Sequence, residues 1–513
     1  MSTQEHLALL GELIMPRLDI DSYTKDARYA ENISGLVRQH RAGGFCVFGG
    51  SAAAVARVVK ELQELAAASQ GNPLLFSCDC EFGLPMRLTE GGTEFPDAMA
   101  MAKTGEPELA YKAAQAIGRE MRAIGLSWNF APVADVNSNP HNPIINTRSF
   151  GERSEIVAEY ASAFVLGLQS EGVAATAKHF PGHGDTSVDS HRELPVITRD
   201  WESFRNLELP PFQALIKHGV SSVMTGHLAA PKLAAHFGAP VGEQNLPATL
   251  SHTLTTSLLR EQLGFDGVIV TDALEMRAIT QHFGADEAAL LAFEAGADVL
   301  LMPHDAASAF DVLVDALDSG RITMNEVQKR AGRIRELKEK TRIEISSIQP
   351  ERLQEYADEH ALLAEEIARK AIELIGNIHL NGAKMIILTD DRPEAIHKSK
   401  MFEELMSPFV SGIEIITPAK WAEGTVQMDR DTILVTFHRA RGYVNPKMDV
   451  VSVPSIVRAM AVLLGTIAPR GLILFGSPYL DSEFQMSPKF VMKTFSESNA
   501  SMVATAERLQ NLP

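Results

Sequence analysis

Short apolar runs alternate with amphipathic stretches from Leu13 to Met302. The runs are almost continuously apolar, which is typical of strands buried on both faces of a parallel sheet. The stretches between them carry apolar residues at helical spacing. Eight strands are predicted, over Leu13–Arg17, Gly44–Phe48, Leu74–Cys78, Leu126–Phe130, Ala174–Lys178, Ser222–Thr225, Val268–Thr271 and Val299–Met302.

Helical patterns lie between these strands and indicate repeated βαβ units. Such units fit a (β/α)8 barrel, but a doubly wound sheet would produce the same alternation. The predicted helices are Glu108–Arg122, Ile156–Ser170, Trp201–His218 and Asp286–Ala295, with Asn325–Lys340 closing the domain.

Polar residues at the strand ends decide between the two folds. A barrel brings the carboxyl ends of all its strands to one face, whereas a doubly wound sheet would concentrate polar groups at one switch point. Because most strands end in a polar residue, we predict an α/β chain with a (β/α)8 TIM-type barrel. These residues are Asp19, Asp79, Asp135, Lys178, His179, His227 and Asp272.

The remaining chain predicts a second α/β region. We expect a catalytic barrel over residues 1–345, a linker and helix over 346–376, and a C-terminal α/β domain over 377–513. The predicted elements are a long helix over Glu351–Ile375, strands over Lys384–Thr389, Ile413–Ile416, Thr432–Phe437 and Gly471–Gly476, and helices near Glu394–Met406 and Ser455–Ile467.

Net charge, cysteine content and the absence of certain motifs limit the partners, cofactors and location that are expected. The net charge of −18 argues against nucleic acid and anionic membrane surfaces as partners, because both require basic patches. The three cysteines, Cys46, Cys78 and Cys80, form no disulfide framework. The N-terminus lacks the features of a signal peptide and no apolar run is long enough to span a membrane, so a cytoplasmic protein is expected. We expect it to be a monomer or a homodimer. No nucleotide-binding fingerprint follows a strand, and no cofactor is expected.

The segment from Lys178 to His191 concentrates the titratable groups, as KHFPGHGDTSVDSH. A metal site, a phosphate site or proton transfer by an Asp–His pair could use them. The histidine spacing is not HExxH, and the prolines and glycines keep the segment off a helix, which disfavours a metal. Residues 181–184 are expected to shape a turn that His183 and Asp185 hold.

Asp189 and His191 favour proton transfer. They are two residues apart on a loop, so the carboxylate can fix the tautomer of the imidazole and favour its charged form. His191 could then donate and accept a proton near neutral pH. An isolated pair of this kind would more often be a surface contact, but the flanking KHFPGHG segment favours a functional role.

Asp272 stands at the end of the apolar strand Val268–Thr271. A carboxylate at this position can point into the barrel mouth and attack an electrophilic carbon. The alternative is a helix N-cap, a position that suits Asp well. The strand-end position favours the nucleophile.

Together these residues resemble glycoside hydrolase family 3, and especially its bacterial β-N-acetylglucosaminidase branch, for which KHFPGHGDTxxDSH is a specific signature. The resemblance covers nearly all of the first domain and weakens after Asn377. It implies that the (β/α)8 TIM-type barrel is followed by a smaller α/β sandwich domain. Further matching segments are Asp79–Glu81, Gly92–Pro96, Phe130–Asp135, Asn146–Gly151, Val223–His227, Leu246–Ser251, Gly264–Ile269 and Ala295–Asp298.

The resemblance implies a role for each matching residue. Asp272 matches the family's nucleophile, and His191 matches its general acid/base with Asp189 as partner. The residues that match contacts to the sugar are Asp79, Arg87, Arg148, Lys178 and His179.

One segment departs from the family. Where the family often has DxEGGR, this chain has Asp79-Cys80-Glu81-Phe82-Gly83-Leu84, which predicts a change of shape on either the aglycone side or the rim of the sugar site. The implied activity is retaining exo-hydrolysis of terminal β-N-acetylglucosaminides from cell-wall muropeptides or chitin-derived sugars. The alternatives are a phosphorylase of the same family and a sugar-binding protein without catalysis.

Overall fold

Contacts divide the chain of the computed structural model into two compact units. The first comprises residues 1–93, 110–139 and 152–360, and the second comprises residues 94–109, 140–151 and 361–513. The structure describes residues 3–69, 71–186, 194–380, 382–390, 392–423, 426, 428–438, 460–461, 469–483 and 487–511.

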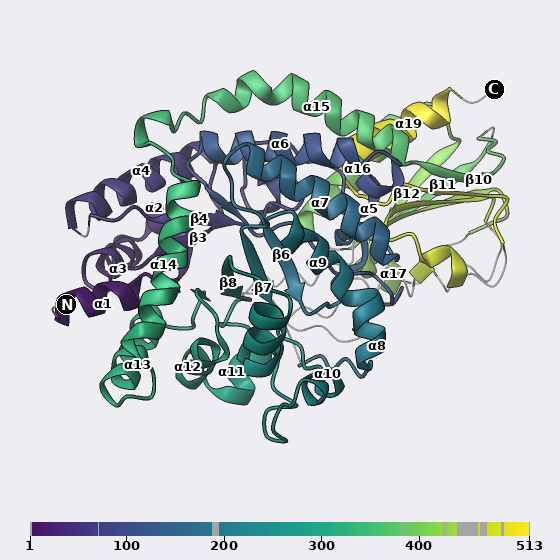
Figure 1. Ribbon diagram of the computed structural model, residues 1–513. Coiled ribbons are helices and arrows are strands. Elements are labelled where there is room, and N and C mark those ends of the chain that lie inside the picture. Colours follow the sequence, from purple (N-terminus) through teal and green to yellow (C-terminus); the bar gives the residue numbers. More distant parts are fainter. Residues whose placement is uncertain are drawn as a thin grey trace. The chain divides into compact units, whose positions relative to one another are not determined.

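The strands of the first unit are parallel and close into a ring, as the predicted barrel requires (Figure 1). The bridge between Trp128 and Ala174 joins β5 to β6, and that between Val270 and Val299 joins β8 to β9, which pairs with β1. The strands are β1 (Ile14–Met15), β2 (Arg17–Asp19), β3 (Gly44–Phe48), β4 (Leu75–Cys78), β5 (Trp128–Asn129), β6 (Thr176–Phe180), β7 (Ser222–Thr225), β8 (Val268–Thr271) and β9 (Leu300–Leu301).

Helices lie outside these strands in Figure 1. They include α2 (Ile20–Lys25), α3 (Ala27–Arg38), α4 (Ala52–Ser69), α6 (Pro107–Ala123), α7 (Ser154–Ser170), α10 (Pro231–His236), α11 (Arg277–Phe283), α12 (Ala285–Ala295), α13 (Ala306–Asp318) and α14 (Met324–Lys340). Four of them, α6, α7, α12 and α14, begin and end within two residues of a predicted helix, because their apolar residues recur at the helical period.

The helix predicted over Trp201–His218 is broken into three parts. It begins as α8 (Trp201–Ser203), continues as the π-helical turn η3 (Phe204–Glu208) and ends as α9 (Leu209–Lys217). Pro210 and Pro211 open α9, and neither has a backbone N–H to donate to the preceding turn. The hydrogen-bond register changes at this point, and the change places Glu208 in the interior.

The second unit is built on one mixed sheet. Its strand order is β10-β15-β14-β13-β11-β12, and only β10 runs antiparallel. The predicted long helix ends at Ala371 as α15 (Arg352–Ala371), and the residues after it form β10 instead. The strands are β10 (Glu373–Gly376), β11 (Lys384–Leu388), β12 (Gly412–Ile416), β13 (Thr432–His438), β14 (Gly471–Gly476) and β15 (Phe490–Lys493).

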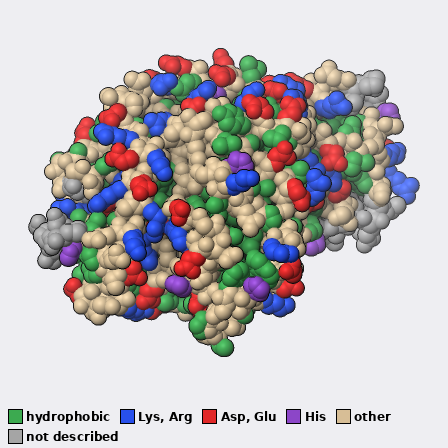
Figure 2. Space-filling model, viewed as in Figure 1, with side chains coloured by type: hydrophobic (Ala, Val, Ile, Leu, Met, Phe, Trp, Pro, Cys, Tyr) green, Lys and Arg blue, Asp and Glu red, His purple; other side chains and the backbone are tan. Residues whose placement is uncertain are grey.

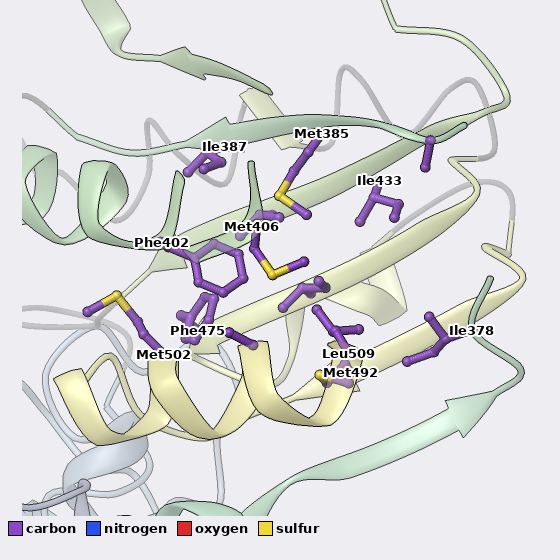
Figure 3. Close-up of a cluster of buried hydrophobic side chains, with 14 of the residues drawn as sticks. Ile378, Met385, Ile387, Phe402, Met406, Ile433, Phe475, Met492, Met502 and Leu509 are labelled. Atoms are coloured by element: carbon purple, nitrogen blue, oxygen red, sulfur yellow. The ribbon is translucent and has the colours of Figure 1, made fainter. Parts of the chain in front are cut away.

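Each face of this sheet has an apolar cluster. Figure 3 shows the larger one, in which Phe402 and Met406 of α16 (Pro393–Met406) and Met502 of α19 (Asn499–Gln510) pack on the strands. Leu388 and Leu434 belong to the cluster on the other face. Burial of alternate strand residues on both faces is what an α/β sandwich requires. Most of the predicted helix Ser455–Ile467 lies outside the described residues.

Two segments between barrel strands belong to the second unit. Asp97, just before α5 (Ala98–Lys103), donates its backbone N–H to Ser496 Oγ at 3.1 Å. Glu94 accepts a hydrogen bond of 2.7 Å from Lys398 Nζ. The chain therefore leaves the first unit and returns to it before the C-terminal region begins.

Acidic and basic side chains are interspersed over the face shown in Figure 2. The net charge of −18 is thus not gathered in one area of that face. No helix among the described residues combines the length and apolar character that a membrane span needs.

Candidate active site

Lys178 is the centre of a buried ion cluster at the C-terminal ends of β4 and β6. Its Nζ lies 2.8 Å from Asp79 Oδ1 and 2.8 Å from Glu81 Oε1. Arg87 Nη2 lies 2.6 Å from the other oxygen of Asp79. The charges of two cations and two carboxylates therefore balance one another. The cluster is largely buried, since the side chain of Lys178 is 2% exposed and that of Asp79 is 16% exposed.

The charges of this cluster fix the ionisation of Asp79. Burial alone would raise the pKa of this carboxyl, but Lys178 and Arg87 outweigh burial and hold the pKa below its usual range. The backbone beside it is clamped by Asn129 at the end of β5, which accepts from Cys80 N at 3.0 Å and donates to Cys80 O at 3.1 Å. Asp79 is thus a charged acceptor held in one orientation.

His179, the next residue on β6, is fixed by Asp135. Its Nδ1 lies 2.8 Å from Asp135 Oδ2, and because a carboxylate accepts, Nδ1 carries the proton. Asp135 Oδ1 also accepts from the backbone N–H groups of His179 at 3.0 Å and His183 at 2.7 Å. Burial would raise the pKa of Asp135, but the hydrogen bonds that it accepts from the ring and backbone of His179 lower it.

The turn after β6 is tightly packed. His183 Nδ1 lies 2.8 Å from Thr186 Oγ1, and burial lowers the pKa of His183 to about 4, so this imidazole is neutral at neutral pH. A Cβ at Gly184 would overlap the carbonyl oxygen of Val136, so only glycine fits there. Arg199 Nε holds Asp185 at 2.6 Å.

Glu208 lies buried beneath this turn. A Cβ at Gly182 would sit 2.8 Å from Glu208 Oε2, and neither oxygen of this carboxyl has a hydrogen-bond partner in the described part of the chain. Burial raises its pKa to about 8; Arg199 opposes the shift, and the charges of Asp135 and Asp185 add to it. Glu208 is therefore an uncharged acid at neutral pH.

Asp272 follows β8 directly. Its backbone N–H donates to Thr225 O at 3.0 Å, and its Oδ1 accepts from Ala273 N at 2.8 Å. The next helix, α11, begins at Arg277 with Met276 in the N-cap position, so Asp272 does not cap it. The charge of Asp272 opposes the effect of burial on the pKa of His183.

The structure brings several predicted site residues together. Asp79, Arg87 and Lys178 form one ion cluster, and His179 follows on the same strand. Asp19, in contrast, caps α2 by accepting from Ser22 N at 2.7 Å.

The remaining predicted site residues are Arg148, Asp189 and His191. Arg148 belongs to the second unit, where it ends η2 (Asn146–Arg148) and donates from Nη1 to Ile144 O at 3.1 Å. Asp189 and His191 fall within residues 187–193, outside the described residues.

Three residues of the site were missed as individual predictions. Glu81 was noted only as part of a motif, although it shares Lys178 with Asp79. Asn129 lies on a strand whose pattern predicted only burial. Glu208 lies in a segment predicted as an amphipathic helix, and the two prolines that follow Leu209 were the one available signal of a break.

The described residues offer no group of three His, Cys, Asp or Glu side chains arranged to hold a metal ion. The carboxylates of the site are engaged by Lys178, Arg87, Arg199 and His179 instead. The arrangement of these residues suits recognition of a polar, hydroxyl-rich ligand, because charged acceptors and donors alternate within hydrogen-bond reach of one another.

Comparison with known proteins identifies relatives of this chain. A model described as "Glycosyl hydrolase family 3 N terminal domain" matches residues 8–337. "Beta-hexosaminidase A" of Pseudoalteromonas piscicida is 36% identical over 328 residues, which cover 60% of this chain and 55% of the relative. "Beta-N-acetylglucosaminidase/beta-glucosidase" of Cellulomonas fimi is 32% identical over 358 residues, 69% of this chain and 62% of the relative.

The chain thus spans 55% and 62% of the lengths of these two relatives. A solved structure gives wider coverage. It is that of a glycoside hydrolase family 3 beta-N-acetylglucosaminidase from Paenibacillus sp. str. FPU-7, with 30% sequence identity, a TM-score of 0.80, and coverage of 99% of this chain and 96% of that one.

Proposed function

Because the chain belongs to glycosyl hydrolase family 3, we propose that it is a glycosidase that removes terminal β-linked N-acetylglucosamine. The names of its relatives support this substrate class. The observation that carries the proposal is the Lys178–Asp79–Arg87 cluster, which lies at the same end of the parallel barrel as Asp272. Cell-wall muropeptides and chitin-derived sugars are the substrates that we propose.

The buried ion cluster would bind the sugar. Asp79 is held ionised and accepts hydrogen bonds from hydroxyl groups, while Arg87 and Lys178 donate to them and His179, whose Nδ1–H faces Asp135, offers Nε2 as an acceptor. We include Arg148 among the sugar contacts because it matches the family motif. Hydrogen bonds to charged groups are about twice as strong as neutral ones, which suits a ligand that carries several hydroxyl groups.

The first chemical step is displacement at the anomeric carbon. A carboxylate oxygen of Asp272 bonds to that carbon as its bond to the glycosidic oxygen breaks, and His191, oriented by Asp189, gives its proton to the departing oxygen. In the second step a water oxygen bonds to the anomeric carbon, its proton passes to His191, and the ester to Asp272 breaks. Two displacements at one carbon retain its configuration.

Trapping the intermediate tests the nucleophile. Incubation with a slow fluorinated N-acetylglucosaminyl fluoride should add one glycosyl mass to the peptide that carries Asp272, and mass spectrometry detects it. Asp272→Ala should lose at least about 10⁴-fold in kcat on 4-nitrophenyl N-acetyl-β-glucosaminide. Asp266→Ala, at the exposed N-terminal approach to the same strand, is the matched control and should retain activity. An active Asp272→Ala variant would refute the assignment.

A separate assay tests whether water or phosphate accepts the glycosyl group. Hydrolysis predicts N-acetylglucosamine as product at a rate that inorganic phosphate does not change, with the β-anomer appearing first by NMR. A rate that depends on phosphate, with N-acetylglucosamine 1-phosphate as product, would establish the phosphorylase alternative instead. No turnover with any β-N-acetylglucosaminide would leave sugar binding without catalysis.

A further inference from the structure

His227 is a buried histidine that links two loops at the catalytic end of the barrel. It follows β7, and its Nε2 lies 2.9 Å from the carbonyl oxygen of Ala273. Because a carbonyl oxygen only accepts, Nε2 carries a proton in this contact. The other ring nitrogen, Nδ1, lies 2.9 Å from Thr249 Oγ1. The side chain has no exposed surface, so these contacts fix the ring.

The carbonyl that His227 holds belongs to the residue after Asp272. The peptide group joining Ala273 to Leu274 is held on both sides: its oxygen accepts from His227, and its N–H donates to Leu301 O at 3.0 Å. The peptide group before Ala273 lies between this fixed plane and the backbone N–H of Asp272, which Thr225 O holds. The N–H of that intervening peptide is the one that donates to Asp272 Oδ1 at 2.8 Å.

The contacts on the other side of His227 lead back to the same aspartate. Thr249, in η4 (Ala248–Leu250), donates from Oγ1 within 3.1 Å of the carbonyls of Thr225 and Gly226. The carbonyl of Thr225 is also the acceptor for the backbone N–H of Asp272 at 3.0 Å. His227 thus closes a ring of contacts around the backbone of Asp272.

We propose that His227 is a positioning residue for Asp272: by holding Ala273 it keeps one carboxylate oxygen on the Ala273 N–H and sets the direction of the other toward the anomeric carbon. This inference rests on the proposed role of Asp272 as nucleophile. A loss of alignment slows attack while the sugar-binding cluster around Lys178 is untouched, so kcat should change and KM should not.

Two substitutions distinguish the roles of the two ring nitrogens of His227. The amide nitrogen of a glutamine lies near the position of Nε2, and that of an asparagine lies near Nδ1. His227→Gln can still donate to Ala273 O, and we expect its kcat to fall less than about fivefold. His227→Asn loses that donor, and we expect a fall of about 100-fold in kcat with KM within about twofold of the original.

Burst kinetics and binding complete the test. The loss in His227→Asn should lie in the glycosylation step for an aryl glycoside, while calorimetry should show unchanged affinity for N-acetylglucosamine. Equal losses in both variants, or a change in KM and affinity instead of kcat, would overturn the proposal. Thr249→Val, which removes only the partner of Nδ1, provides a second measurement should His227→Asn not fold. It should lower kcat with KM unchanged, and a wild-type kcat would also overturn the proposal.

Failure of the proposed function gives a different result. If Asp272→Ala retained activity, the nucleophile assignment would be wrong whatever the His227 variants did. If Asp272→Ala is inactive and His227→Asn turns over like the original chain, only the positioning role is wrong.

Discussion

Lys178 Nζ lies 2.8 Å from Asp79 Oδ1 although the lysine side chain is only 2% exposed. The same ammonium lies 2.8 Å from Glu81 Oε1, and Arg87 holds the second oxygen of Asp79. Removal of one partner from such a cluster leaves a buried charge imbalance, whereas removal of a cation and an anion together does not.

Lys178→Met should therefore destabilise the first unit by about 3–5 kcal/mol, measured as the free energy of unfolding in urea. Addition of Glu81→Gln should recover part of that stability, because it removes one of the two carboxylates that lost their shared cation. Activity should stay low in the double variant, since Lys178 is proposed to contact the sugar. Lys112→Met, at an exposed position on α6, is the control and should change stability by less than about 0.5 kcal/mol. Full recovery of activity in the double variant would contradict a sugar contact.

Asp135→Asn should disturb the ring of His179 more than the fold. The remaining carbonyl oxygen can still accept from the backbone N–H groups of His179 and His183, but the new NH2 group faces the proton on Nδ1 of His179. The ring should change tautomer or turn away, and kcat/KM should fall about 10- to 100-fold.

Nitrogen NMR of the imidazole can check this directly. The original chain should show a protonated Nδ1 on His179, and Asp135→Asn should show an unprotonated one. The control is Asp185→Asn, in which the carboxylate partner of Arg199 changes while Asp135 does not. An unchanged His179 spectrum in Asp135→Asn would exclude Asp135 as the group that sets the tautomer.

The barrel could be predicted from the sequence because the apolar runs at β3, β4, β7 and β8 coincide with strands buried on both faces. The strand ends also placed Asp79, Lys178 and Asp272 at one face, since parallel strands end together. These predictions depend only on the spacing of apolar residues and on strand direction, and both can be derived from residues close together in the sequence.

Other features depend on partners that are distant in the sequence. β10 continues the apolar pattern of α15, and only its pairing with β15 makes Glu373–Gly376 a strand. Asp97 bonds Ser496 across a separation of 399 residues, so the transfer of residues 94–109 to the second unit has no local signal. Glu208 was missed because the π-helical turn, rather than the period of α9, directs it inward.

Gly182→Ala should destabilise the turn after β6 for two reasons. Gly182 has φ of 127°, which L-residues rarely adopt, and the added Cβ would lie 2.8 Å from Glu208 Oε2 and 2.9 Å from Glu208 Cβ. We expect a loss of about 2–4 kcal/mol in the free energy of unfolding. Gly219→Ala, at φ of 73° with nothing within 4 Å, should lose only about 1 kcal/mol. Glu208→Ala should relieve part of the loss in a double variant, and strictly additive losses would exclude the contact.

Glu208 should make stability depend on pH between about 4.5 and 8. Burial raises the pKa of its carboxyl to about 8, whereas the pKa in the unfolded chain is close to 4.5. Between these values the folded chain keeps a proton that the unfolded chain releases. The stability that Glu208 contributes is therefore fully present below the pKa of the unfolded chain and is lost as pH rises toward 8. The free energy of unfolding falls by up to about 1.4 kcal/mol per pH unit over this range.

Glu208→Gln cannot ionise and should not show this loss. The free energy of unfolding of the variant minus that of the original chain should become more positive from pH 5 to pH 8 and then level off, measured by urea denaturation at fixed ionic strength. Glu202→Gln, at an exposed position six residues earlier, is the control for the loss of a carboxylate at the surface. A constant difference for Glu208→Gln would mean that the carboxylate is charged in the folded state, with Arg199 stabilising that charge against burial and against Asp135 and Asp185.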